Sequence, residues 1–169
     1  ATTNFWSLDL SKPDAELAWK ELPPWSGPPR ILPLAASQSN GENDCLYLFS
    51  GRNPHSEKAT EMLTDAYKFD PPDKTWPPLA EISTGEGQPR CIMAGTCAPI
   101  GVAHILVFGG ADGQRFLEIE KLNTRISELD RIGKDSNETN STELAELKTQ
   151  HLRFHEQHTG FSQDILAYH

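Results

Sequence analysis

A unit of the sequence recurs about sixty residues further along the chain, and this repeat constrains the fold more than any other feature. The segment from Gly27 to Arg30 (Gly-Pro-Pro-Arg) returns as Gly87 to Arg90 (Gly-Gln-Pro-Arg). The apolar run 46–51, which ends in Ser-Gly, returns as 105–110, which ends in Gly-Gly. Repeats of this length are typical of propeller blades, in which similar small antiparallel sheets are arranged around a ring.

Each copy predicts short strands. An arginine opens an apolar run, 30–36 and then 90–98, which we expect to be the innermost strand of a blade. The second strand ends at glycine, where the backbone can turn sharply. A third element, with an aromatic residue near its end, appears at 4–9, 65–70 and 164–169. The sequence therefore predicts a four-stranded blade over about 30–79, with parts of a blade on either side.

Tryptophans follow the third element in the first two copies. Trp19 precedes Lys-Glu-Leu-Pro, and Trp76 precedes Pro-Pro-Leu. We expect both indoles to be buried between blades, where their large apolar surface would cover the outer part of a sheet.

Helical periodicity interrupts the last blade between its second and third strands. Apolar residues in 114–133 are spaced three, four and three apart, which places them on one helical face: Ile119, Leu122, Ile126 and Leu129. Gly133 is a natural stop. Asn140 with Glu143 resembles a capping box that opens a second helix through about His158. We expect Leu144, Leu147 and Leu152 to face the core, and we assign 111–163 to a helical insertion.

This combination resembles the bacterial N-acetylneuraminate epimerases, also called sialic acid mutarotases, and their cyclically permuted relatives, which are kelch-repeat propellers. The segments that carry the resemblance are 27–30, 63–70 with Trp76, 93–95, 107–111, the insert containing Gly133-Lys134-Asp135-Ser136, and 161–168. The chain departs from the pattern in two places: Ser50-Gly51 replaces a diglycine, and the loop 37–44 is longer than expected.

The resemblance implies that residues 1–169 are part of a single kelch β-propeller domain, a mainly β fold with about two to three of an expected six blades and a two-helix insertion. The remaining blades of the same protein would close the ring. It also implies a periplasmic or exported enzyme that interconverts the anomers of N-acetylneuraminate without a cofactor. Its catalytic acid and base are expected outside this chain.

Three arginines are the candidate substrate-binding residues. Arg30 and Arg90 precede successive innermost strands, and a planar guanidinium suits the carboxylate of a sugar acid. The alternative is that repeated arginines brace the blades. Arg52, directly after Ser50-Gly51, is a weaker candidate that could simply be exposed.

Other function classes fit less well. Net charge −9 argues against a nucleic-acid partner, and no apolar stretch is long enough to cross a membrane. His151, His155 and His158 share a helical face, but no nearby pattern completes a metal site, so we expect no metal. A copper oxidase site is not recognisable. A kelch scaffold that binds another protein remains the alternative to the enzyme, because fold alone does not fix function.

Overall fold

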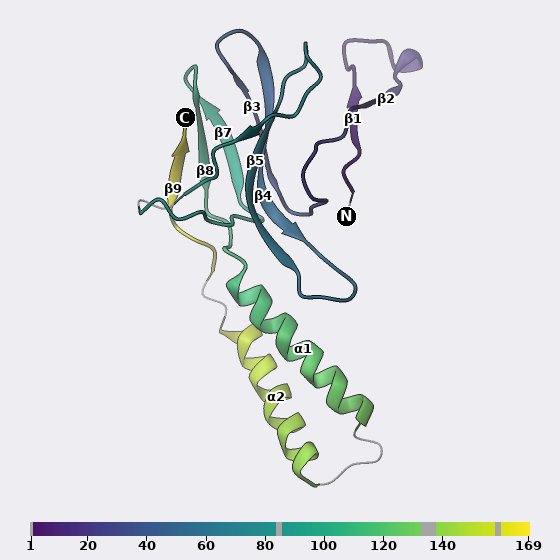
Figure 1. Cartoon of the computed structure of the whole chain (residues 1–169), viewed down its shortest axis with the longest axis vertical. Helices are drawn as coiled ribbons and strands as arrows, with labels where there is room; N and C mark the ends of the chain where they lie inside the picture. Colours follow the sequence, from purple (N-terminus) through teal and green to yellow (C-terminus); the bar gives the residue numbers. More distant parts are fainter. Residues whose placement is uncertain (1, 84–85, 133–137, 158–159) are drawn as a thin grey trace.

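The computed structural model describes residues 2–83, 86–132, 138–157 and 160–169. Three antiparallel sheets lie side by side, and two helices extend from one end of them (Figure 1). The first sheet contains β1 (Phe5–Leu8) and β2 (Trp19–Leu22), which a 3-10 turn (Asp14–Glu16) joins. The second contains β3 (Leu34–Ser39), β4 (Asp44–Asn53), β5 (Glu61–Phe69) and β6 (Pro78–Leu79). The third contains β7 (Thr96–Ile100), β8 (His104–Phe108) and β9 (Ile165–Tyr168).

The second sheet is a complete blade with the order β3-β4-β5-β6, which confirms the predicted four-stranded unit. Alternate residues of β3 are buried, as expected for a strand with one face on the core. β3 also contacts β7, the corresponding strand of the next sheet. Parts of two further blades therefore flank one complete blade, as the repeat predicts.

The innermost strands begin later than predicted. β3 starts at Leu34 and β7 at Thr96, not at Arg30 and Arg90. The physical cause is a residue in the left-handed region just before each strand, Leu32 (φ 54°) and Ala94 (φ 55°), which interrupts the extended backbone.

The loop after β3 is also shorter than predicted. Residues 37–39 pair with 44–46, which leaves residues 40–43 as the connection. Asn40 closes this turn, because its Oδ1 accepts hydrogen bonds from the backbone N–H groups of Glu42 and Asn43.

Strand register makes the repeats equivalent. Ala66 lies opposite Phe49 in the second sheet, and Ile165 lies opposite Phe108 in the third. The preceding residues, Asp65 within β5 and Asp164 directly before β9, are therefore equivalent in register.

Two apolar clusters cover opposite faces of the complete blade. The cluster toward the first sheet is centred on Leu48, Phe69 and Trp76, with Phe5 of β1 packed against it. The cluster toward the third sheet joins residues of both sheets and of the segment between β6 and β7: Leu34, Ala36, Phe49, Ala66, Ile82, Ile92, Ile105 and Val107. The blade thus buries both faces, which stabilises it through the hydrophobic effect.

One of the two tryptophan predictions is wrong for this chain. Trp76 is 8% exposed, but Trp19 is 66% exposed. Trp76 packs edge-on against Phe5 and donates its indole N–H to the carbonyl of Pro23 at 3.0 Å. β2 pairs with β1, and although its Leu22 packs against the cluster around Trp76, Trp19 itself stays largely exposed.

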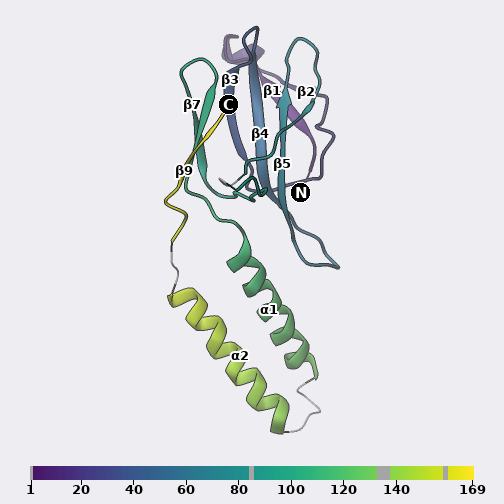
Figure 2. The same ribbon diagram turned by 60° about the vertical axis from the view of Figure 1, so that its left-hand side comes forward.

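The insertion consists of α1 (Gln114–Ile132) and α2 (Glu138–Glu156), which pack side by side and extend beyond the strand ends (Figure 2). The helical face predicted for α1 is correct, since Leu129 is buried and Ile119, Leu122 and Ile126 are partly buried. α2 begins two residues before Asn140 and ends at Glu156. Gly133, the 133–136 motif and His158 lie outside the described residues.

Leu152 does not face the core; it is 61% exposed. The partly buried aliphatic and aromatic side chains of α2 are Leu144, Leu147, His151 and Phe154, at helical steps of three, four and three. Leu152 is one residue away from that line and therefore lies on another face of the helix.

The start of α1 is attached to the complete blade. Thr60, in the turn between β4 and β5, donates both its backbone N–H and its hydroxyl to the Glu120 carboxylate. The guanidinium carbon of Arg52 lies 3.6 Å from the centre of the Phe116 ring, a cation–π contact. These contacts position the first half of α1 relative to β4 and β5.

Candidate functional site

A pocket of about 530 Å³ lies where the third sheet meets the helical insertion. Its walls come from the segment before β7, the diglycine corner after β8, both helices and the segment before β9. The lining residues include Arg90, Met93, Arg115, Phe116, His155 and Phe161. Its volume lies in the usual range for small-molecule sites.

The diglycine corner shapes one wall of this pocket. Gly110 has φ 86°, a backbone conformation that residues with a side chain rarely adopt. A Cβ atom there would also lie only 2.6 Å from Cγ2 of Ile92, so there is no room for a side chain. Backbone bonds between Met93 and Ala111 and from Ser162 N–H to the Gly110 carbonyl hold the corner in place. The three segments at this wall therefore form one hydrogen-bonded unit.

Arg90 lines the pocket and is paired. Its Nη1 donates to Oδ2 of Asp164 at 2.7 Å, and its Nη2 donates to the hydroxyl of Ser162 at 3.1 Å. The bond from Arg90, with a second from Ser162, lowers the pKa of Asp164 below its ordinary value. The carboxylate therefore stays charged and keeps the arginine oriented.

Arg30 lies inside the complete blade, with no exposed side-chain surface. Its two terminal nitrogens donate to both oxygens of Asp65 at 2.7 and 2.8 Å, and Nη1 also reaches the carbonyl of Ser50 at 2.9 Å. Trp25 and Tyr67 each place a ring 5.5 Å from its guanidinium carbon. This geometry fixes the arginine between three parts of the blade.

The two arginines thus make the same kind of ion pair in successive blades. Asp65 and Asp164 are equivalent by register, and each accepts from the arginine that precedes the innermost strand of its sheet. Such pairs match the bracing alternative. Only Arg90 of the two lines the pocket, and contact of either with a substrate stays a prediction.

Arg52, the third candidate, stands apart from the other two. It is partly buried rather than fully exposed, and its guanidinium covers Phe116 on α1. Its Nε and Nη1 meet no acceptor among the described residues. It is absent from the lining of the pocket, although the ring that it covers is part of that lining.

Arg115 was not singled out from the sequence, yet it lines the pocket beside Arg90. It is the second residue of α1, and its guanidinium carbon lies 5.1 Å from the ring centre of Phe154 on α2. His155, the next residue on α2, also lines the pocket. The available signal was the place of Arg115 two residues after Gly113, where α1 begins beside the diglycine corner.

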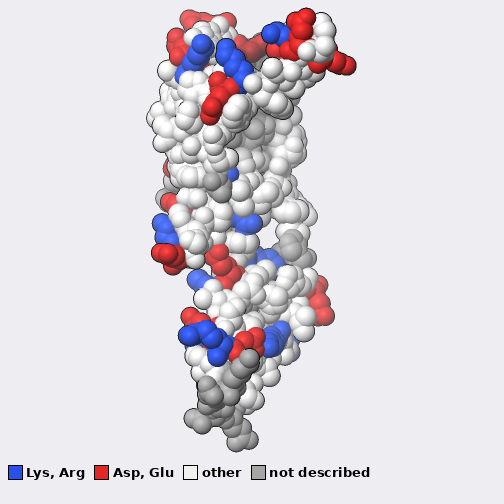
Figure 3. All heavy atoms as spheres, turned by 90° about the vertical axis from the view of Figure 1, so that its right-hand side faces the viewer, with Lys and Arg blue, Asp and Glu red and all other residues white. Residues whose placement is uncertain are grey.

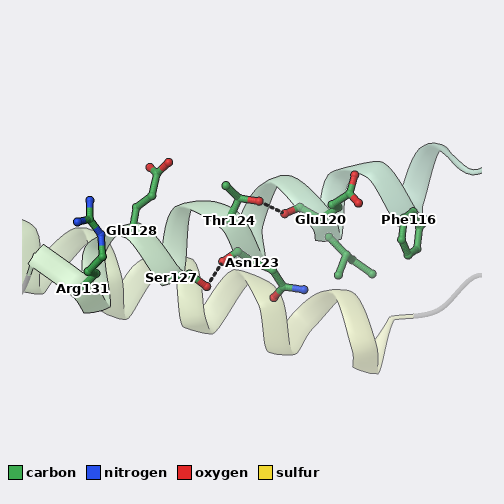
Figure 4. Close-up of a pocket in the computed structure, with 8 residues that line it drawn as sticks. Phe116, Glu120, Asn123, Thr124, Ser127, Glu128 and Arg131 are labelled. Carbon is green, nitrogen blue, oxygen red and sulfur yellow. Dashed lines mark hydrogen bonds between the residues drawn. The ribbon is translucent and has the colours of Figure 1, made fainter. Parts of the chain in front are cut away.

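A second hollow runs along α1 (Figure 4). The hydroxyls of Thr124 and Ser127 lie in this hollow but bond to the carbonyls of Glu120 and Asn123, one turn earlier in the same helix. Such back-bonding occupies the donors without preparing them for a ligand.

The structure indicates no metal centre in the part of the chain that it describes. No group of three or more potential ligands among His, Cys, Asp and Glu comes together there. The rings of His151 and His155 lie 4.7 Å apart on α2. None of the described helices is both long and apolar enough to cross a membrane.

Comparisons with known proteins identify the family to which this chain belongs. The family model for N-acetylneuraminate epimerase matches residues 1–169. The chain belongs to the N-acetylneuraminate epimerase family. An N-acetylneuraminate epimerase of Pasteurella multocida (strain Pm70) is 32% identical over 111 residues, which cover 66% of this chain and 26% of that relative. One from Haemophilus influenzae (strain PittEE) is 31% identical over 108 residues, 64% of this chain and 26% of that relative.

A solved chain described as "Structure of YjhT" aligns with a TM-score of 0.63 and 20% sequence identity. The alignment covers 98% of this chain and 42% of the solved chain. This likeness confirms the fold as part of a β-propeller. The chain spans about a quarter of the length of the curated family members it matches, so most of each relative lies outside the aligned segment.

Proposed function

We propose that the chain is part of a kelch-type β-propeller enzyme that interconverts the α and β anomers of N-acetylneuraminate. The observation that carries this proposal is the match of the N-acetylneuraminate epimerase family model to the whole of residues 1–169. The arginine-lined pocket beside the insertion supports it, because the substrate is an anion and the chain as a whole is strongly acidic.

The chemistry is acid/base-assisted ring opening. A base takes the proton of the anomeric hydroxyl while an acid protonates the ring oxygen. The ring C–O bond breaks, and the anomeric carbon becomes a carbonyl. Reclosure on the other face returns both protons and gives the other anomer, with no net consumption of any reactant. We place the acid and the base on blades beyond this chain.

The partner required is the rest of the propeller. On the side of the molecule that carries β1 and β2, charged groups gather at the top of the view and again from about mid-height down, with a largely uncharged area between these two groups (Figure 3). Trp6 and Trp19 on these strands are 47% and 66% exposed. An apolar sheet face of this kind suits contact with another blade of the same protein. We further propose a periplasmic or exported location, which rests on the family alone.

The test uses the intact protein. NMR of freshly released α-N-acetylneuraminate should show faster approach to the anomeric equilibrium with enzyme than in buffer or with heat-inactivated enzyme. Unchanged anomer exchange, on this and related sugar acids, would reject the mutarotase and leave the binding scaffold.

A further inference from the structure

The arginines around the insertion differ in how their donors are used. Arg30 is held by Asp65 and Ser50, and Arg90 by Asp164 and Ser162. Their bonds lie within the blades, so a ligand would have to compete with an existing partner. A carboxylate in the pocket requires an arginine whose donors are still available.

Arg115 meets this requirement. Its Nε and Nη2 are shielded from solvent and have no hydrogen-bond acceptor among the described residues. These two nitrogens carry parallel N–H groups on one edge of the guanidinium, and a carboxylate accepts from such an edge with both oxygens. Buried charged donors without an acceptor are costly, so binding of an anion there would remove a penalty as well as form two bonds.

The surroundings of Arg115 strengthen this interaction. Phe154 and Phe116 contribute apolar surface beside it, and apolar walls increase the electrostatic attraction between a guanidinium and a carboxylate. Among the described lining residues Asp112 is the one that is acidic, and its Oδ1 already accepts the backbone N–H of Gln114 at 3.0 Å.

We propose that Arg115 binds the carboxylate of the sugar acid and that Arg30 and Arg90 brace the blades. This inference rests on the proposed function, because it takes the pocket to be where that substrate lies. It assigns the specificity for an acidic sugar to the helical insertion, while the repeated arginines of the blades maintain the shape of the site.

The experiment compares two sugars in the intact enzyme. N-Acetylneuraminate carries the carboxylate, and its methyl ester keeps the ring and the anomeric hydroxyl without the charge. Arg115→Met should lower kcat/KM for the acid by about ten- to hundredfold, mainly through KM, because charge-assisted bonds are lost. The ester should change by less than about twofold, and Arg115→Lys should recover only part of the loss.

Arg131→Met is the matched control, since it removes the same charge from an exposed position on the same helix. An equal loss for acid and ester in Arg115→Met would overturn the proposal, because a purely structural role affects both sugars alike. Calorimetric titration with N-acetylneuraminate separates the role of Arg115 in binding from the proposed mutarotase activity. If the wild type binds the acid through Arg115 without accelerating anomer exchange, the inference holds and the mutarotase fails. Binding that is unchanged in Arg115→Met overturns the inference.

Discussion

The first sheet and the complete blade each carry a tryptophan at the equivalent position of the repeat, yet only one of the two side chains is buried. Trp19 and Trp76 each lie three residues before a leucine that pairs with the third strand. Trp76 is covered by Phe5 and Trp25 from the preceding segment of the chain. Trp19, by contrast, is 66% exposed. The motif therefore encodes a surface for a neighbouring blade, and burial comes only when that neighbour is present.

Removal of the covered tryptophan should have the largest effect. Trp76→Ala should lower the free energy of unfolding of the intact protein by about 3–5 kcal/mol, because it leaves a cavity between two sheets and removes the bond to Pro23. Equilibrium denaturation measures this loss. A change below about 1 kcal/mol would show that the aromatic cluster contributes little to stability.

Trp19→Ala is the matched variant for this comparison. If another blade packs on β2 in the intact protein, as we propose, its cost should approach that of Trp76→Ala. A cost below about 1 kcal/mol, typical of exposed positions, would instead mean that β2 remains at an open edge.

The two ion pairs provide the next test, because the same motif is buried in one sheet and more exposed in the next. The side chains of Arg30 and Asp65 are 0% and 28% exposed, whereas those of Arg90 and Asp164 are 23% and 58% exposed. Arg30→Met should cost about 2–3 kcal/mol of stability, since it strands the Asp65 carboxylate.

Two further variants check this explanation by denaturation. The double change Arg30→Met with Asp65→Leu should recover part of the loss, because no charge is then left unpaired. Arg90→Met should shift the unfolding midpoint much less than Arg30→Met, since water can solvate the exposed Asp164. Equal losses at the two arginines would contradict the difference in burial.

The repeated part of the fold was predictable from the sequence. The predictions that were wrong depended on the conformation of single backbone positions or on neighbouring sheets. Period and apolar runs gave the blade and the insertion. The strand starts were wrong because left-handed Leu32 and Ala94 are not residue types that signal such a conformation. The exposure of Trp19 depends on a neighbouring sheet, which its own sequence motif does not contain.

The site was predictable only in part, for a similar reason. Arg90 could be found because it repeats with the blade. Arg115 belongs to no repeat, and its place in the pocket depends on how α1 and α2 pack against the diglycine corner. Residues of an insertion become interpretable only when its position on the scaffold is known.

The smallest expected effect concerns Ser50, where the complete blade departs from the diglycine of the third sheet. Ser50 is fully buried and has φ 54°, like its equivalent Gly109 with φ 62°, so a serine here tolerates backbone strain. Its hydroxyl compensates, because it donates to the Leu63 carbonyl at 2.7 Å and accepts from the Ile92 N–H at 2.6 Å. The second bond joins the corner to the segment that leads into the next blade.

Ser50→Gly should therefore destabilise the protein by about 1 kcal/mol, although glycine is the better residue for this backbone. Relief of left-handed strain contributes roughly 1 kcal/mol, but an unpaired buried N–H at Ile92 costs about 1–3 kcal/mol. Denaturation of the intact protein gives the net value, and hydrogen exchange at the Ile92 amide should become faster. If Ser50→Gly stabilises the protein instead, the strain outweighs the hydroxyl's two bonds, and the serine does not tie this blade to the next.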